Sequence, residues 1–482
     1  MAPTATTSAG SLSGVETEHG IAFRGVRYAV ADRFALPQPV PAWDGTAAAD
    51  TTGTAAPQVI TSDAAIPDMA VGDVGEDCLR AEVWTPSTEG KRPVLVWVPG
   101  GRFQIGSAGL ATYDGARLAA EGDVVVIGVN YRLGALGFLA ADGVPSNLGL
   151  RDLIAALQWI RNEAAAFGGD GTNITLMGES AGAGAIAHLL ASPAARGLFD
   201  GAIVASGAPG STLDQSSAET VANTYLSACG VDRIAELQGR PVSELLAAQA
   251  DADAELLATV GMMPFHPWVD GDLLPAGPLG AELAPVPLVI GTTADEMALF
   301  RDQIPALPEE FAVPWLASKA SAFAADAEHS ARAGLAACDG DLAEAIADTD
   351  LHVPASLLAD RHAARSLPIW RYRFDWQAPD LGAAHATDLP FHFGTLDVAE
   401  WRATLGADGD QAQAADILSS AMRQAWATFC HTKAPACDPI GAWPIHEPDR
   451  RPAAILGSPV SIAADVGGPR FRAWTSPPEE NT

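Results

Sequence analysis

Residues 173–190 read NITLMGESAGAGAIAHLL, and this stretch decides the fold. Its apolar first part predicts a buried β-strand, and its alanine-rich second part predicts an α-helix. Between the two, Gly178-Glu179-Ser180-Ala181-Gly182 is the only GxSxG in the chain. In this strand–turn–helix setting the motif is typical of a nucleophile elbow, whose strained turn presents the serine hydroxyl at the carboxyl end of a sheet. The alternative interpretation is a glycine-rich turn with a passive serine.

Further apolar runs lie on both sides of this motif. They are continuous rather than alternating, which predicts strands buried on both faces. The predicted strands are AEVWTP (81–86), RPVLVWV (92–98), DVVVIGV (123–129), GAIVASG (201–207), VPLVIGTT (286–293) and PIWRYRFDW (368–376). Helical spacing recurs over 147–169, where Asn147 is the expected N-cap, and over 417–430. The alternation predicts the α/β class, with a mostly parallel central sheet flanked by helices.

Two helix-rich stretches, about 208–283 and 300–366, interrupt this alternation. We expect them to form a lid-like region over one end of the sheet, where they shape the binding cavity. No linker composition separates any part of the chain, so residues 1–482 are predicted to form a single domain.

The composition excludes several classes of function. There are 59 Asp and Glu against 28 Lys and Arg, a formal net charge of -31. Such a surface repels nucleic acid and anionic lipid. No apolar run reaches the roughly 18 residues of a membrane span. Residues 1–20 lack the basic and apolar segments of a signal peptide, so we expect a cytoplasmic protein.

The cysteines fit that location, because they are few and odd in number, unlike a secreted disulfide framework. They are Cys78, Cys229, Cys338, Cys430 and Cys437. Cys430 and Cys437 lie close enough in sequence for a local bridge, but unpaired thiols are the favoured interpretation. The Cys and His residues show no zinc spacing, and neither a metal nor an organic cofactor is expected.

A nucleophilic serine requires a proton acceptor, usually a histidine oriented by a carboxylate. The histidines that follow the strands of the first half are His329, His352, His362, His385, His392, His431 and His446. His385 is the best-placed base, because it lies in the loop LGAAHATDLPF (381–391) directly after a predicted strand. His392 is its rival, although its setting LPFHFG is typical of a packed segment.

Two candidates for the acid follow the strand over 286–293. Asp295 and Glu296 are adjacent, so their side chains should point in different directions and only one should serve. The pattern alone leaves both open. A helix cap formed by Asp295 is also consistent with it, and would leave Glu296 free to contact the histidine.

An acyl-transfer site also needs N–H donors for the oxyanion, each worth about 3 kcal/mol in a dry site. One should be the N–H of Ala181, after the nucleophile. The others should come from the loop Pro99-Gly100-Gly101-Arg102-Phe103, which follows a buried strand. A plain glycine turn is the alternative for this loop. Gly100, Phe103 and Phe391 are candidate substrate contacts.

Several blocks in the same order make the chain resemble the type-B carboxylesterase family, which includes bacterial p-nitrobenzyl-type esterases, carbamate hydrolases and cholinesterases. The blocks are FRGVRYAVADRF (23–34), EDCLRAEVWTP (76–86), VNYRLGALGFL (129–139), NITLMGESAGA (173–183), VDGDLLP (269–275), GTTADEMALF (291–300) and HATDLPFHFG (385–394). The resemblance covers nearly the whole chain and implies the α/β-hydrolase fold. It also implies that Glu296 is the acid and His385 the base.

The chain departs from the family pattern at four places. Pro99 stands where His or Tyr is common, and Arg102 stands where the loop usually has Gly or Ala. The resemblance implies that the N–H groups of Gly101 and Arg102 are the oxyanion donors, so neither change removes a donor. The side chain of Arg102 is expected to narrow the site or attract acidic acyl groups. Met297 replaces the usual Gly after the acid. No cysteine precedes Cys78, so the disulfide of secreted relatives is absent.

The resulting hypothesis is a serine carboxylesterase acting on a small-molecule ester, with an acyl-enzyme on Ser180. The same triad also serves a carbamate or amide hydrolase or an acyltransferase, and these alternatives stay open. A non-catalytic binding protein on the same fold is a remote alternative. The protein is expected to be a monomer or a homodimer, with a pH profile governed by a histidine pKa of roughly 6.5.

Overall fold

The computed structural model describes residues 2–59, 66–68, 71–257, 259–261, 263–304, 307–398 and 400–477. Within them, an 11-stranded sheet runs in the order β16-β15-β12-β11-β10-β9-β7-β8-β6-β4-β3. Its strands are β3 (Val15–Thr17), β4 (Gly20–Arg27), β6 (Arg80–Thr85), β7 (Arg92–Val98), β8 (Val125–Val129), β9 (Gly169–Glu179), β10 (Gly201–Ala205), β11 (Leu288–Thr293), β12 (Ile369–Phe374), β15 (Ala453–Leu456) and β16 (Ser461–Ala463).

The centre of this sheet is parallel and its edges are antiparallel. The strands from β8 through β7, β9, β10, β11 and β12 to β15 pair in parallel. Antiparallel pairs close both ends. The central strands are buried on both faces, as their continuous apolar runs predict; all five residues of β8 are buried. The α/β-hydrolase fold expected from the sequence is confirmed.

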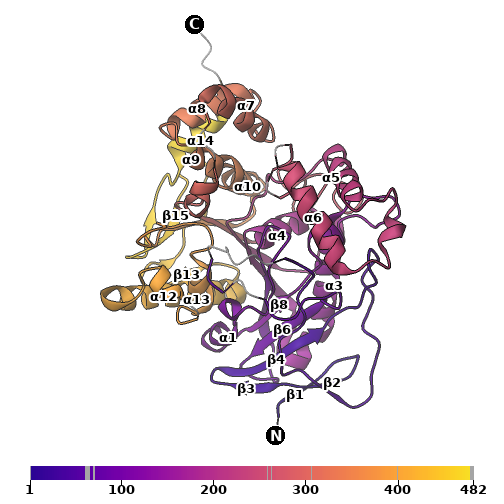
Figure 1. Cartoon of the computed structure of the whole chain (residues 1–482). Coiled ribbons are helices and arrows are strands. Elements are labelled where there is room, and N and C mark those ends of the chain that lie inside the picture. The colour runs from indigo at the N-terminus through magenta and orange to yellow at the C-terminus, as the bar shows by residue number, and fades with distance from the viewer. Residues whose placement is uncertain are drawn as a thin grey trace.

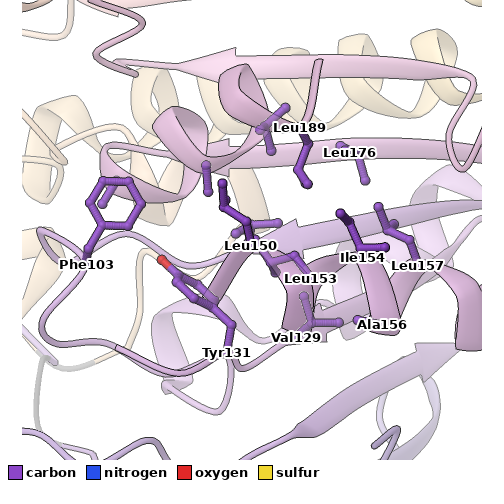
Figure 2. Packing of buried hydrophobic residues seen from close by; sticks show 14 of the residues in the cluster. Phe103, Val129, Tyr131, Leu150, Leu153, Ile154, Ala156, Leu157, Leu176 and Leu189 are labelled. Carbon is purple, nitrogen blue, oxygen red and sulfur yellow. The ribbon is translucent and has the colours of Figure 1, made fainter. Parts of the chain in front are cut away.

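Helices cover the two faces of the sheet, and the alternating side chains of β7 contribute to an apolar cluster on each face. Val94, Val96 and Val98 join the cluster under α3 (Leu148–Glu163) and α4 (Ala181–Ala191). Leu95 and Trp97 point the other way, into the cluster that includes residues of α1 (Ala116–Gly122) and α13 (Ala412–Thr432). Figure 2 shows part of the first cluster, where Leu150, Leu153, Ile154 and Leu157 approach Val129, Leu176 and Leu189.

The two helix-rich stretches lie in the upper part of Figure 1. The first contains α5 (Gln215–Ala228) and α6 (Val242–Leu256). The second contains α7 (Glu309–Ala320), α8 (Ala327–Ala337), α9 (Leu342–Ala347) and α10 (Val353–Ala364). Leu316 and Leu335 of the second group pack with Trp474 of α14 (Gly468–Thr475) in a third apolar cluster.

Shorter elements complete the described chain. β1 (Thr4–Thr6), β2 (Ser11–Ser13) and β5 (Thr46–Ala48) form a small sheet, and β13 (Ala436–Cys437) pairs with β14 (Gly441–Ala442). The remaining α-helices are α2 (Gly134–Phe138), α11 (Leu389–Phe393) and α12 (Trp401–Thr404). No helix among the described residues combines the length and hydropathy needed to cross a membrane. All five cysteines are free thiols, as the sequence favoured.

Asn147 is the N-cap residue of α3, as expected, but its side chain does not cap the helix. Asn147 precedes α3 in a left-handed conformation, with φ 51°, and its side chain makes no cap hydrogen bond. Instead its amide bonds both backbone groups of Trp268 and donates to Asp270. The side chain therefore joins α3 to a loop that is distant in sequence, and this long-range partner competes successfully with the local cap.

Candidate active site

Ser180 occupies a strained turn between β9 and α4. Its φ of 55° and ψ of -125° lie outside the regions that L-residues normally adopt. The two motif glycines make this turn sterically feasible. A β-carbon on Gly178 would lie 2.7 Å from the carbonyl carbon of Gly182, and one on Gly182 would overlap the carbonyl oxygen of Val98. The serine is therefore held at the end of β9 by close backbone packing that only glycine permits.

Three side chains from distant parts of the chain meet in a line. The Ser180 Oγ lies 2.8 Å from Nε2 of His385, and Nδ1 of His385 lies 2.6 Å from Oε2 of Glu296. Ser180 follows β9, Glu296 follows β11 and His385 lies in the loop after β12. Because β9, β10, β11 and β12 are consecutive in the parallel sheet, their carboxyl ends bring these loops to one edge.

The carboxylate of Glu296 is completely buried and held on both oxygens. Oε2 faces His385, while Oε1 accepts the backbone N–H of Thr293 at 2.9 Å. Burial raises the pKa of Glu296, but the hydrogen bond and the positive charge of His385 outweigh burial and lower it below its usual value. The group is therefore negatively charged at neutral pH and suited to stabilise an imidazolium.

Asp295 has a different role from a helix cap. Its carboxylate accepts the N–H of Ala383 at 2.8 Å, and its backbone forms a β-bridge with Ala384. The alternative of a helix cap is therefore not realised, because a partner 88 residues away in sequence donates to the carboxylate. This contact ties the loop that carries His385 to the loop that carries Glu296, which fixes the distance between base and acid.

His392, the rival base, lies in the core. Its Nε2 lies 3.0 Å from Oδ2 of Asp388, and its Nδ1 accepts the indole N–H of Trp426 at 3.0 Å. The ring is wholly buried on α11. Both ring nitrogens therefore have hydrogen-bond partners inside the core, which agrees with the packed segment that the aromatic setting indicated.

The loop after β7, which holds the expected oxyanion donors, has a strained backbone. Gly101, Arg102 and Phe103 all have positive φ, of 112°, 56° and 60°. The carbonyl of Gly101 accepts the N–H groups of Gln104 and Ile105, and Tyr131 donates its hydroxyl to the carbonyl of Pro99. Carbonyl groups thus anchor the loop, and such strain is typical of functional turns.

Among the residues that the structure describes, no acceptor competes for the N–H groups of the expected oxyanion donors. In the described chain, no loop or turn hydrogen bond uses the N–H of Gly101 or Arg102. Ala181 is the first residue of α4, where the N–H has no carbonyl one turn earlier to donate to. The loop lies against the serine, since a β-carbon on Gly100 would come within 3.1 Å of Ser180 Cβ.

The three candidate substrate contacts have different surroundings in the structure. Gly100 adjoins Ser180, as described above. Phe103 is largely buried against Phe138, with ring centroids 5.2 Å apart. Phe391 is completely buried against Phe374 and Trp376 in the core beneath the site. The expectation for Phe391 is therefore wrong, because a position on α11 that follows the base in sequence faces inward. Arg102, by contrast, is exposed.

Sequence reasoning missed Glu179, which it treated as a spacer in the GxSxG motif. Its Oε1 lies 3.2 Å from Nε2 of His385, and burial raises the pKa of its carboxyl to about 8. Burial lowers the pKa of His385, but Glu179 and Glu296 outweigh it and raise that pKa to about 9. The only signal in the sequence was an ionisable residue inside an otherwise apolar strand–helix turn.

Among the described residues, no three His, Cys, Asp or Glu side chains cluster in a way that could hold a metal ion. The fold and the arrangement of serine, histidine and glutamate define the class: a serine hydrolase of the α/β-hydrolase fold.

Comparison with known proteins narrows this class. The sequence profile described as "Carboxylesterase family" matches residues 1–463. The chain is 34% identical to para-nitrobenzyl esterase of Bacillus subtilis over 95% of its length and 96% of the relative. It is 34% identical to phenmedipham hydrolase of Pseudarthrobacter oxydans over 97% and 98%. A solved structure of a thermophylic PNB esterase superposes with a TM-score of 0.88 at 31% identity, covering 98% of this chain and 100% of the other.

The chain belongs to the carboxylesterase family. It is a serine hydrolase that acts on carboxylic esters. The resemblance on which the sequence hypothesis rested is confirmed, and the non-catalytic binding protein is excluded.

Proposed function

We propose that Ser180 is the nucleophile, His385 the general base and Glu296 the residue that orients the base. The observation that carries this proposal is the line of two short contacts, 2.8 Å from Ser180 to His385 and 2.6 Å from His385 to Glu296. A base must lie within hydrogen-bond reach of the proton that it removes, and this imidazole does.

The reaction proceeds in two halves. Nε2 of His385 takes the hydroxyl proton of Ser180 as Oγ forms a bond to the ester carbonyl carbon. The negative charge on the carbonyl oxygen is held by the N–H groups of Gly101, Arg102 and Ala181. The imidazolium gives its proton to the departing alcohol as the ester C–O bond breaks. Water then repeats the sequence on the acyl-serine, and the acid is released.

The preferred substrates are proposed to be small esters with an aromatic alcohol, such as p-nitrobenzyl and p-nitrophenyl esters. The printed name of the para-nitrobenzyl esterase relative supports this choice. So does an aromatic side chain beside the base: the ring of Phe300 lies 6.1 Å from the ring of His385. Carbamate or amide hydrolysis and acyl transfer remain predictions from the shared triad.

The protein is proposed to act in the cytoplasm, as a monomer or a homodimer. Five free thiols support a reducing compartment. Cell fractionation that follows esterase activity tests the location, and light scattering of the purified protein tests the oligomeric state. Activity recovered outside the cytoplasmic fraction would contradict the first expectation.

A panel of p-nitrophenyl esters of increasing acyl length, with a matched carbamate and anilide, tests the reaction. We expect Ser180→Ala to lose about 10⁵-fold or more in kcat on every ester. Ser330→Ala is the control, since Ser330 is also a buried serine but lies on α8. Equal turnover by Ser180→Ala and the control would end the nucleophile assignment. Faster turnover of the carbamate or anilide than of the ester would overturn the substrate class.

A further inference from the structure

A cavity of about 140 Å³ lies apart from the triad, on the face of the sheet beneath α10 and α14. Two neighbouring strands supply its floor in register: Ile290 of β11 pairs with Arg371 of β12, and Thr292 pairs with Arg373. Side chains two residues apart on a strand share a face, so both arginines project toward the same space. Neither Ser180 nor His385 lines it.

The charge around this cavity is unbalanced. Arg371, Arg373 and Arg470 line it, against the single carboxylate of Asp348. That carboxylate is already taken, because Arg470 contacts it at 2.8 Å and Trp474 donates to it at 2.9 Å. The carboxylates outside the lining are engaged as well: Glu344 bonds Arg470, and Asp375 bonds Arg373.

Within the described chain, Arg371 is the arginine of this lining that forms no ion pair. Among the described residues, no carboxylate lies within ion-pair distance of its guanidinium. Its Nη2 has only neutral acceptors, Ser356 Oγ at 3.2 Å and the carbonyl of Val466 at 3.5 Å. Its Nη1 is completely buried and makes no hydrogen bond within the described part of the chain. Buried charges in proteins are normally paired, so we expect this arginine to bind an anionic partner.

Two nearby carboxylates, Asp360 and Asp465, raise the pKa of Arg371 and favour its cationic form, but both form their ion pairs with other arginines. Burial and the nearby guanidinium of Arg451 lower the pKa of Arg371 to about 10, so the side chain stays charged at neutral pH. Arg451 is itself paired with Asp360. The Nε of Arg373 is a second buried donor without an acceptor. Two N–H groups on adjacent positions of one strand face are therefore available to a ligand.

We propose that this cavity binds a small oxyanion, with Arg371 as its principal ligand and Arg373 as the second. The volume of the cavity limits the size of its ligand. For comparison, an engineered cavity of about 150 Å³ in another protein accommodates benzene. Inorganic phosphate fits this limit and offers several acceptors to guanidinium donors. A nucleotide or a phospholipid is too large. His352 and Ser356, which also line the cavity, supply further polar contacts.

Calorimetric titration of the full-length protein with inorganic phosphate, at constant ionic strength set with KCl, tests the proposal. We expect saturable binding, weakened at least about tenfold by Arg371→Gln because a charge-assisted hydrogen bond is lost. Arg371→Lys should retain part of the affinity. Arg332→Gln is the matched control, since Arg332 is an exposed arginine on α8 that pairs with Glu309 and Glu328.

Thermal unfolding with and without phosphate gives a second readout, with an expected rise in Tm of about 2 °C at saturation. Phosphate also stabilises folded proteins in general, so the comparison between variants decides. If Arg371→Gln does not fold, as judged by circular dichroism, Arg373→Gln replaces it and should weaken binding severalfold. Wild type without saturable binding, or variants with unchanged affinity, would overturn the proposal.

Discussion

The two carboxylates beside the imidazole of His385 come from different segments of the chain and differ in the hydrogen bonds that they accept. Glu296, after β11, contacts Nδ1 and also accepts a backbone N–H, so both oxygens have partners. Glu179, at the end of β9, faces Nε2, and its Oε1 makes no hydrogen bond within the described chain. The pKa of Glu296 is lowered, while burial raises that of Glu179 to about 8.

This difference shows that reach to the histidine does not make two buried carboxylates equivalent. Donated hydrogen bonds keep Glu296 charged in spite of burial. Glu179 lacks such support on Oε1 and changes its charge close to neutral pH. We therefore expect Glu296 to control the orientation of the His385 imidazole, and Glu179 to control the pKa of that imidazole. Four substitutions sharpen or break this distinction.

The largest effect is expected from Glu296→Gln. An amide cannot hold the imidazole in the required tautomer or stabilise the imidazolium, so kcat should fall about 10⁴-fold on p-nitrophenyl acetate. Glu163→Gln is the matched control, because Glu163 is also a buried glutamate but accepts the backbone N–H of Ser8 and takes no part in the triad. Steady-state kinetics of both variants measure the difference. A loss of less than tenfold in Glu296→Gln would break the distinction.

The second-largest loss of activity is expected from a substitution in the loop after β7, which lies against Ser180. A β-carbon on Gly101 would overlap the carbonyl of Ile105, and the φ of 112° is strained for alanine. Gly101→Ala should displace the oxyanion donors and lower kcat about 10²- to 10³-fold with little change in KM. Gly197→Ala is the control, since Gly197 also has a positive φ but nothing within 4 Å. Comparable losses in both variants would contradict the prediction.

Glu179→Gln should change the pH profile more than the maximal rate. His385 accepts a proton only when neutral, and the negative charge of Glu179 stabilises its protonated form. The raised pKa, about 9, delays the rise of activity to alkaline pH, later than the 6.5 expected from the sequence. Removing the charge should shift this limb of kcat/KM to lower pH. A limb that stays in place, or moves upward, would show that Glu179 does not set the pKa.

The smallest effect is expected from Arg102→Ala. The guanidinium is exposed beside the oxyanion donors, and an exposed charge contributes little in water. We expect kcat/KM to fall about two- to fivefold for an ester with a carboxylate on its acyl chain, with neutral butyrate unaffected. The difference should shrink at high salt. Equal changes on both substrates would assign Arg102 a purely steric role.

The local parts of this architecture could be predicted from the sequence. Continuous apolar runs indicated the central strands, and the glycines around Ser180 indicated the elbow. His385 and the pair Asp295-Glu296 were found because they directly follow predicted strands. These signals are strong because burial on both faces and tight turns restrict which residue types can occupy a position.

Other contacts could not be predicted, for one common reason. Asn147 and Asp295 have side chains that suit local caps, yet both bond to segments far away in the sequence. Phe391 follows the base closely but faces the core, because α11 turns its side chain inward. A single sequence carries no record of which distant segment approaches a side chain, so local propensity was the only guide.

The sequence by itself determined the order of strands and helices, the elbow and the residue types available for acyl transfer, because each depends on neighbours along the chain. The tertiary structure alone decided which carboxylate meets which nitrogen of His385, and which arginine of the second cavity forms no ion pair among the described residues. These properties depend on distance and on exclusion from water, and both are set only when the carboxyl ends of the strands are assembled at one edge of the sheet.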